Sequence, residues 1–144
     1  VIVSRTMSKA FAFAGARLGY MAADKVVIDA IQLVRLPYHL SAITQAAAEV
    51  ALEFKGELLA EVKRLSFDRD RLIKSLNELG LTVIPSEGNF ILFKGFKQSS
   101  HELWETLLAE GVLIRDVGLP GYLRVTIGNE AENQAFLKAL KGAL

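Results

Sequence analysis

The sequence predicts a mixed fold, in which an α/β part is followed by a smaller α+β part. Two observations support this prediction. Up to residue 79, apolar residues recur mainly at helical spacings of three and four, after one short apolar strand at the N-terminus. From residue 72 onward, a helix, a glycine, a strand, a turn and a second strand follow one another twice, which is the order of a small α+β domain. We place the division between residues 1–56 and residues 57–144.

The first part is expected to contain one strand and two helices. Residues 1–8 are predicted to form a strand that enters a loop, and the apolar triplet at its start indicates a buried strand. Asp24 can cap a helix that Pro37 stops. Ser41 can cap the next helix, and Gly56 is expected to break the chain before the following one.

The second part opens with a long amphipathic helix at residues 57–79. Arg69 interrupts its apolar stripe, and we interpret it as a solvated or paired residue at a domain seam. Gly80 suits the left-handed position that ends a helix. The patterns Ser99-x-x-Glu102 and Asn129-x-x-Glu132 are typical of capping boxes and open two further helices. Gly111 is expected to close the first of these helices, and strands are expected at residues 81–84, 89–93, 112–115 and 122–127.

The composition argues against several classes of function. The net charge is +1, from 17 basic and 16 acidic residues without a basic block, so nothing favours a nucleic-acid or membrane partner. There is no cysteine, which excludes disulfides and thiolate-bound metals, and with 2 histidines we expect no metal site. The apolar runs are too short to cross a bilayer. We therefore expect a cytoplasmic enzyme.

The start and the apolar content of the chain predict that it is a piece of a longer protein. The sequence begins Val-Ile-Val without an initiator methionine. Its hydrophobic fraction is 51% without glycine, whereas a typical domain reaches about 45–50% with glycine included. The excess apolar surface is expected to pack against residues outside this chain.

The residues from Thr6 to Tyr20 carry the candidate chemistry. Lys9 lies in an apolar, small-residue run, where desolvation disfavours the charged amine and favours a nucleophilic one. Thr6 and Ser8 can donate hydroxyl hydrogen bonds to an anion, and the guanidinium of Arg17 can clamp a phosphate. An amine beside a phosphate clamp suggests pyridoxal phosphate, which has both an aldehyde and a phosphate. The alternative is a buried helix start with a lysine stem on apolar surface.

Two arginines near the C-terminus are predicted to point away from the core. In residues 122–127 the branched apolar residues share one strand face, and Arg124 lies on the other. In residues 112–115 Arg115 likewise lies opposite a valine and an isoleucine. Both are either solvent-exposed on an open sheet face, or they line a cleft and bind anions.

These motifs resemble a known family. Thr6-x-Ser8-Lys9 and Ala14-Gly15-x-Arg17-x-Gly19-Tyr20 are similar to the lysine segment of fold-type I aminotransferases, and most of all to that of the histidinol-phosphate aminotransferases. Leu123 to Gly128 resembles the closing motif of the same family, and Gly111 to Asp116 its preceding segment. The resemblance implies the C-terminal portion of that fold. Residues 1–56 would end the large cofactor-binding domain, and residues 57–144 would form a linking helix and the small C-terminal domain.

The resemblance also implies roles. Lys9 would be the catalytic Schiff-base lysine for pyridoxal 5'-phosphate, and three residues would hold the cofactor phosphate. Three further residues would bind substrate: one at its α-carboxylate, one at its far end, which is expected to be a phosphate, and one near the site. The residues for the cofactor phosphate are Thr6, Ser8 and Arg17. Those for the substrate are, in the order of the roles just given, Arg124, Arg115 and Asn89. Alternatively, Asn89 only hydrogen-bonds the turn before it.

The implied reaction is reversible amino transfer between L-glutamate and imidazole-acetol phosphate, a step in histidine biosynthesis. The partners would be a small amino donor and a keto acid, and the family forms homodimers with shared active sites. The family's other cofactor contacts lie before the lysine, so this chain alone is expected to bind the cofactor weakly and to be inactive. Alternatives are an aromatic-amino-acid aminotransferase, a phosphate-linked decarboxylase with the same cofactor, or a non-catalytic α+β interaction module.

Overall fold

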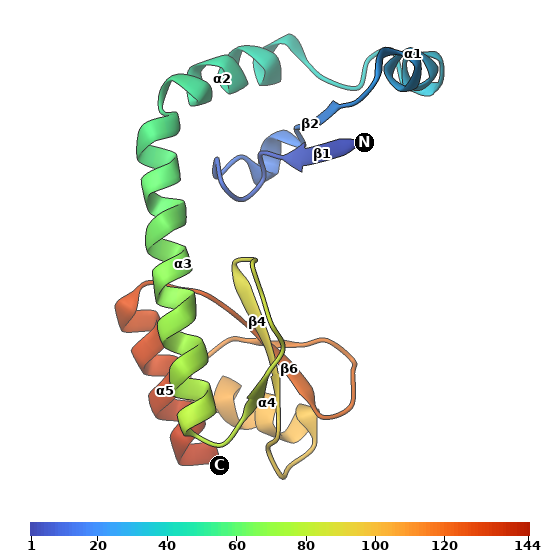
Figure 1. Ribbon diagram of the computed structural model, residues 1–144. Coiled ribbons are helices and arrows are strands. Elements are labelled where there is room, and N and C mark those ends of the chain that lie inside the picture. Colours follow the sequence, from blue (N-terminus) through green and yellow to red (C-terminus); the bar gives the residue numbers. More distant parts are fainter. The chain divides into compact units, whose positions relative to one another are not determined.

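The computed structural model describes all 144 residues. The chain folds as two compact units, Val1–Val62 and Lys63–Leu144. The division falls inside the longest helix, α3 (Lys55–Glu78) (Figure 1). No helix combines the length and the apolar character that a membrane span requires.

The first unit begins with a hairpin, of which the sequence predicted only the first strand. β1 (Val3–Thr6) pairs antiparallel with β2 (Gly19–Ala22), a strand that was not anticipated. The loop between them contains a short 3-10 helix, η1 (Ala14–Ala16). The predicted burial of the N-terminal strand is wrong for this chain, because the apolar residues Val1 and Ile2 at its start are exposed.

Two capped helices complete this unit. α1 (Lys25–Val34) and α2 (Ala42–Glu53) begin where predicted, since Asp24 accepts a hydrogen bond from a backbone N–H two residues on, at 3.0 Å, and Ser41 accepts one from the N–H three residues on, also at 3.0 Å. No residue of α1 is buried, and Ala48 is the one buried residue of α2. The apolar faces of both helices therefore remain uncovered, as the excess of apolar residues predicted.

The predicted break at Gly56 is wrong. α2 ends at Glu53 and α3 starts at Lys55, so the glycine lies inside the first turn of α3. The turn is made by Phe54, whose φ of −89° and ψ of 13° are open to any residue. Its carbonyl already accepts the N–H of Leu58 at 3.1 Å, so the new helix starts at once.

The second unit is an antiparallel sheet with three helices on one face (Figure 1). The strand order is β3-β4-β6-β5. The strands are β3 (Thr82–Val83), β4 (Phe90–Lys94), β5 (Arg115–Asp116) and β6 (Tyr122–Thr126), and the helices are α3, α4 (Ser100–Ala109) and α5 (Glu130–Ala143). The fully buried core side chains come from all three helices and the two central strands: Leu72, Leu76, Leu103, Leu107, Leu140, Ile91, Phe93 and Leu123.

The ends of these helices follow the sequence. Both predicted capping boxes are confirmed, at Ser99 with Glu102 and at Asn129 with Glu132. Gly80 takes a φ of +79°, a conformation that a side chain would strain, as its place after α3 predicted. Helix formation in the second unit was thus readable from local signals.

The predicted strand over residues 112–115 is mostly wrong, because β5 contains only Arg115 and Asp116. The N–H of Val112 is used by the end of α4, where it donates to the carbonyl of Leu107 at 2.9 Å. The carbonyl of Ile114 accepts the indole N–H of Trp104 at 3.1 Å. These backbone groups are therefore satisfied outside the sheet.

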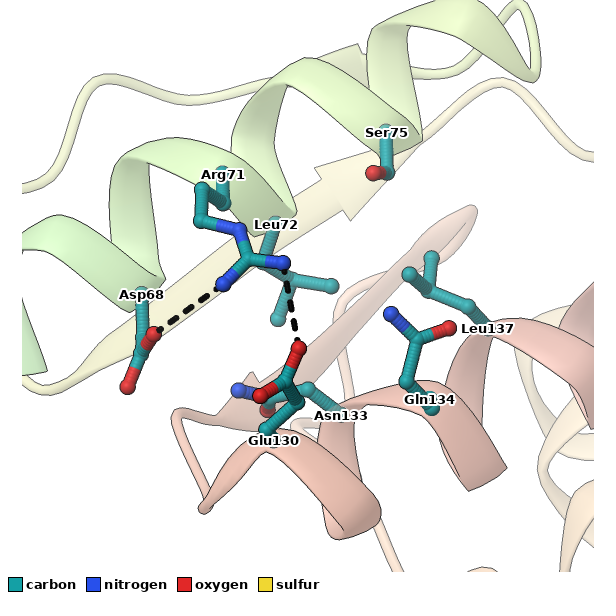
Figure 2. Close-up of a pocket in the computed structure, with 8 residues that line it drawn as sticks. All are labelled: Asp68, Arg71, Leu72, Ser75, Glu130, Asn133, Gln134 and Leu137. Carbon is teal, nitrogen blue, oxygen red and sulfur yellow. Dashed lines mark hydrogen bonds and ion pairs between the residues drawn. The ribbon is translucent and has the colours of Figure 1, made fainter.

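Two arginines on α3 make ion pairs, one of them buried and one half-exposed. Arg69 is buried and donates to Asp70 at 3.0 and 3.1 Å, and it lies 3.4 Å from Glu87, so the paired interpretation is confirmed. Arg71 reaches the first turn of α5, with 3.3 Å between its guanidinium and the Glu130 carboxylate (Figure 2). These pairs join α3 to its neighbours in the second unit.

Candidate functional site

The four residues predicted to bind the cofactor lie on one hairpin. Thr6 is the last residue of β1 and pairs with Gly19, the first residue of β2. Ser8, Lys9 and Arg17 all lie in the loop that joins these strands. One closed loop, which we call the lysine loop (residues 7–18), therefore presents the candidate amine, hydroxyl and guanidinium, with the Thr6 hydroxyl at its base.

Backbone hydrogen bonds close the lysine loop at its base. Met7, which is buried, donates its N–H to the carbonyl of Leu18 at 3.1 Å, and its own carbonyl accepts the N–H of Phe13 at 3.2 Å. The two ends of the loop are thereby held together. Ser8 and Arg17 are the chain neighbours of Met7 and Leu18, so both belong to the same end of the hairpin.

The two hydroxyl groups meet directly. The Thr6 hydroxyl donates to Ser8 Oγ at 2.8 Å, and the Ser8 backbone N–H donates back to Thr6 Oγ1 at 3.1 Å. Because the Thr6 proton is directed at Ser8, the Ser8 hydroxyl proton is free to be donated onward. The linked hydroxyls thus leave one proton, that of Ser8, to be donated to an anion.

Arg17 is held in an unusual backbone conformation. Its φ of 53° and ψ of 39° are left-handed, which is uncommon for a residue other than glycine. Its Nη1 donates to the carbonyl of Ala14 at 3.2 Å, and the rest of the exposed guanidinium remains available. Ala12 is also left-handed, with a φ of 52°. Strain of this kind concentrates at functional loops.

Lys9 is exposed in this chain, so the predicted desolvation of its amine is not provided by the described residues. The apolar residues around it in sequence do not enclose it, because Met7 alone in this segment is buried. Its backbone carbonyl accepts the N–H of Ala12 at 3.0 Å, which fixes the turn that carries it. An amine, two hydroxyls and a guanidinium on one loop form a donor set that fits the aldehyde and the phosphate of pyridoxal phosphate.

Gly19 is needed by the hairpin itself. A Cβ at this position would lie 2.6 Å from the carbonyl oxygen of Arg5 on β1, a distance that real Cβ contacts do not reach. The structure thus gives a steric reason for a glycine at position 19, which the spacing of the motif alone did not supply.

The second group of candidates lies on the sheet of the second unit. The register places Arg115 on β5 directly opposite Arg124 on β6, and therefore on the same face. The neighbours of Arg124 in sequence, Leu123 and Val125, are buried in the core. The prediction that Arg124 points away from the core is therefore confirmed.

Neither arginine has an acidic partner among the described residues. The Arg124 guanidinium lies 4.9 Å from the centre of the Phe90 ring, and its Nε is buried without a hydrogen-bond partner. Arg115 is exposed. Two like charges directly across a sheet destabilise it, and an anion between them would remove that cost.

Asn89 lies beside the same strand. Its backbone carbonyl accepts the N–H of Ile127 at 3.0 Å, just beyond the end of β6. The turn before it is held by Ser86, whose hydroxyl donates to the carbonyl of Phe90 at 2.7 Å and accepts the N–H of Gly88 at 3.2 Å. The Asn89 side chain makes none of the turn's hydrogen bonds, which argues against the alternative of a purely structural turn residue.

Sequence reasoning missed one cation on this face. Lys94 on β4 pairs with Tyr122, so it shares the face of Arg124. Only the strand register reveals this, because no motif marks the lysine in the sequence.

The chain is similar to known aminotransferases. Residues 1–140 match the family described as aminotransferase class I and II. The chain is 58% identical over 139 residues to a histidinol-phosphate aminotransferase of Rhodococcus jostii, which covers 96% of this chain and 36% of that relative. It thus spans well under half of the length of the curated relatives it matches, 38% for the one from Paenarthrobacter aurescens.

The fold is also similar to those of solved enzymes, one of them an aminotransferase. The histidinol-phosphate aminotransferase of Clostridium acetobutylicum is similar with a TM-score of 0.81 and 31% identity, over 98% of this chain and 45% of that one. The L-threonine-O-3-phosphate decarboxylase of Porphyromonas gingivalis is similar with a TM-score of 0.80 and 30% identity, over 98% of this chain and 46% of that one.

Proposed function

The chain belongs to the class I and II aminotransferases, and we propose that it supplies the lysine and the anion-binding side chains of a pyridoxal-phosphate-dependent histidinol-phosphate transaminase. The fold class predicted from the sequence, part of a fold-type I enzyme, is confirmed by this match and by the likeness to solved aminotransferases. The proposed reaction is amino transfer between L-glutamate and imidazole-acetol phosphate.

One observation supports this proposal above the others: the lysine loop gathers the cofactor-binding candidates in a chain that is 58% identical to a curated relative of that name. The name comes from the relative, and the loop supplies suitable chemistry. A non-catalytic interaction module gains no support from a family match over residues 1–140.

In the proposed enzyme Lys9 bonds the cofactor and then carries a proton to and from the substrate α-carbon. Ser8, Thr6 and Arg17 bind the cofactor phosphate through hydroxyl and guanidinium donors. Pyridoxal phosphate, when bound, supplies the electron sink that stabilises charge at that carbon. Lys9 is exposed, so exclusion of water from its amine requires further residues to pack over the lysine loop.

The arginine pair suits both proposed substrates. Glutamate carries an α-carboxylate, and histidinol phosphate carries a phosphate on the carbon next to the amine-bearing one. Arg124 and Arg115 share a sheet face and can receive either anion. Asn89, which directly precedes β4, is proposed as a further substrate contact because its amide makes no hydrogen bond of the turn.

We also propose the wider organisation that the family resemblance implied. Residues 1–56 would complete a large cofactor-binding domain, and residues 57–144 would form a small domain with its linking helix. The uncovered apolar side chains of α1 and α2, such as Leu33 and Val50, support packing against further protein, including a second copy in a homodimer. A cytoplasmic location is proposed on the ground of the biosynthetic reaction.

Reduction with borohydride tests the proposal on the full-length enzyme that contains these residues. With cofactor present, a pyridoxyl adduct is expected on the peptide that carries Lys9, and none is expected in the Lys9→Ala variant. The exposed Lys25, which pairs with Asp29 at 2.6 Å, offers a matched control as Lys25→Ala. An adduct on another lysine, or none, would refute the assignment.

A phosphate-linked decarboxylase is the second candidate, because a solved enzyme of that kind is similar over 98% of this chain. The two reactions differ in what they consume and release. A transaminase needs 2-oxoglutarate to turn over histidinol phosphate, whereas a decarboxylase releases carbon dioxide without a keto acid. Release of carbon dioxide from a phosphorylated amino acid would favour the decarboxylase.

A further inference from the structure

The sheet face that carries the two arginines holds a third cation. Lys94 lies opposite Tyr122, and Arg124 is two residues further along the same strand. Diagonal neighbours of this kind in an antiparallel pair are about 7–8 Å apart, within reach of long side chains. Lys94, Arg124 and Arg115 therefore lie on one face of the sheet, which we call the cationic face.

The cationic face has no acidic residue. The other side chains that the register assigns to it are apolar or hydroxyl-bearing, and none of the three cations takes part in an ion pair. Arg124 and Lys94 rest against aromatic rings instead, at 4.9 Å from the centre of Phe90 and 5.3 Å from the centre of Tyr122. The face combines three unneutralised charges with one buried donor, Arg124 Nε, that has no partner.

Fold stability does not explain this arrangement. Like charges on neighbouring strands cost free energy, and the core lies on the opposite face of the sheet, where Ile91 and Phe93 are fully buried. A phosphate dianion carries two charges on one group, whereas each of the two carboxylates of glutamate carries one charge and three carbons separate them. The field of a nearby cation therefore acts more strongly on the phosphate than on either carboxylate.

We propose that Lys94 is a specificity-determining residue, which favours the phosphorylated substrate over glutamate by adding a third positive charge to the arginine pair. This inference rests on the proposed function. Lys94 acts through its electric field on the phosphate dianion, and its contact with the Tyr122 ring keeps the ammonium on the cationic face.

The field of Lys94 has a predictable size. A unit charge about 10 Å from a dianion in water changes the affinity about fourfold without salt. The effect shrinks strongly at high ionic strength, where the Debye length falls to about 3 Å at 1 M. A purely structural role of Lys94 would show no such dependence on salt.

The experiment measures steady-state kinetics of the full-length enzyme with histidinol phosphate and with glutamate, at low and at high salt. Lys94→Gln is expected to raise the KM for histidinol phosphate about threefold to fivefold at low salt, with kcat unchanged. The KM for glutamate should change less than twofold. Lys94→Arg should restore the wild-type KM, and Lys97→Gln, which removes an exposed lysine outside the strands, should leave it unchanged.

Each other outcome is decisive. An active wild type with the same KM in Lys94→Gln and Lys97→Gln overturns this inference and leaves the proposed function standing. Equal increases of KM for both substrates, or an increase that persists at 1 M salt, overturn it as well. A wild type that does not transaminate histidinol phosphate overturns the proposed function, and this inference with it.

Discussion

Replacing Arg115 by glutamine should stabilise the protein while weakening its proposed substrate binding. Arg115 is exposed and lies directly opposite Arg124, with no acidic partner for either. Two unit charges about 8 Å apart in water repel by about 0.5 kcal/mol, within the range of about 0.2–1 kcal/mol for cross-strand pairs. The substitution removes this repulsion and deletes no core contact.

The expected gain corresponds to a rise in Tm of about 1 °C. Loss of a charge-assisted hydrogen bond of about 1.5–3 kcal/mol should raise the KM for histidinol phosphate by about tenfold or more. Thermal unfolding without substrate and steady-state kinetics of the full-length enzyme measure the two effects. Only a functional cation is expected to move them in opposite directions.

The matched control is Lys97→Gln, which removes one positive charge away from the arginine pair and should alter neither quantity. A lower Tm for Arg115→Gln together with an unchanged KM would refute the reasoning. That result would mean that Arg115 is an ordinary surface residue that contributes to folding.

Three further predictions concern the framework. Gly19→Ala places a Cβ 2.6 Å from a β1 carbonyl, so it should open the hairpin and reduce cofactor binding, measured by the visible absorbance of bound pyridoxal phosphate. Leu76→Ala empties a site that is 0% exposed and should cost about 2–5 kcal/mol in urea unfolding. Two hydrogen bonds with Ser99 lower the pKa of Glu102 below 4.5. The larger effect comes from the Ser99 backbone and the smaller from the Ser99 side chain. The ionised Glu102 side chain therefore stabilises the fold above pH 4.5, and this stabilisation is lost as the pH falls through the lowered pKa. In Glu102→Gln, the free energy of unfolding should fall less steeply at acid pH.

Each of these predictions has a control that the structure supplies. A Cβ at Gly15 meets nothing within 4 Å, so Gly15→Ala should keep the cofactor absorbance; equal losses for both glycines would contradict the steric argument. Leu108 is 43% exposed, and Leu108→Ala should cost much less than the core variant. Glu110 lies at the other end of α4 and takes part in no ion pair, so Glu110→Gln should reduce the acid-side loss much less than Glu102→Gln. An acid-side loss in Glu102→Gln as steep as that of the wild type would disprove the capping argument.

The local signals in the sequence were sufficient for most helix ends. Asp24, Ser41, Ser99 and Asn129 cap helices as expected because a cap needs only a side-chain oxygen within a few residues of the free N–H groups. Gly56 misled the prediction, since a glycine permits a break but does not require one.

Strand positions were less predictable, because strands depend on distant partners. β2 was missed since its pairing with β1 closes over the whole lysine loop. The strand expected over residues 112–115 shortened because Trp104 takes the Ile114 carbonyl, a contact that no local pattern encodes.

The sequence by itself determined the family, the lysine with its phosphate-binding neighbours as candidates, and the alternation that turns Arg124 from the core. The tertiary structure decided which side chains share a surface. Register across β4, β6 and β5 sets Lys94, Arg124 and Arg115 on one face, and hydrogen bonds at Met7 close the loop around Lys9. The physical reason is that local patterns fix the direction of a side chain relative to its own backbone, whereas its neighbours are fixed only by pairing between segments far apart in the chain.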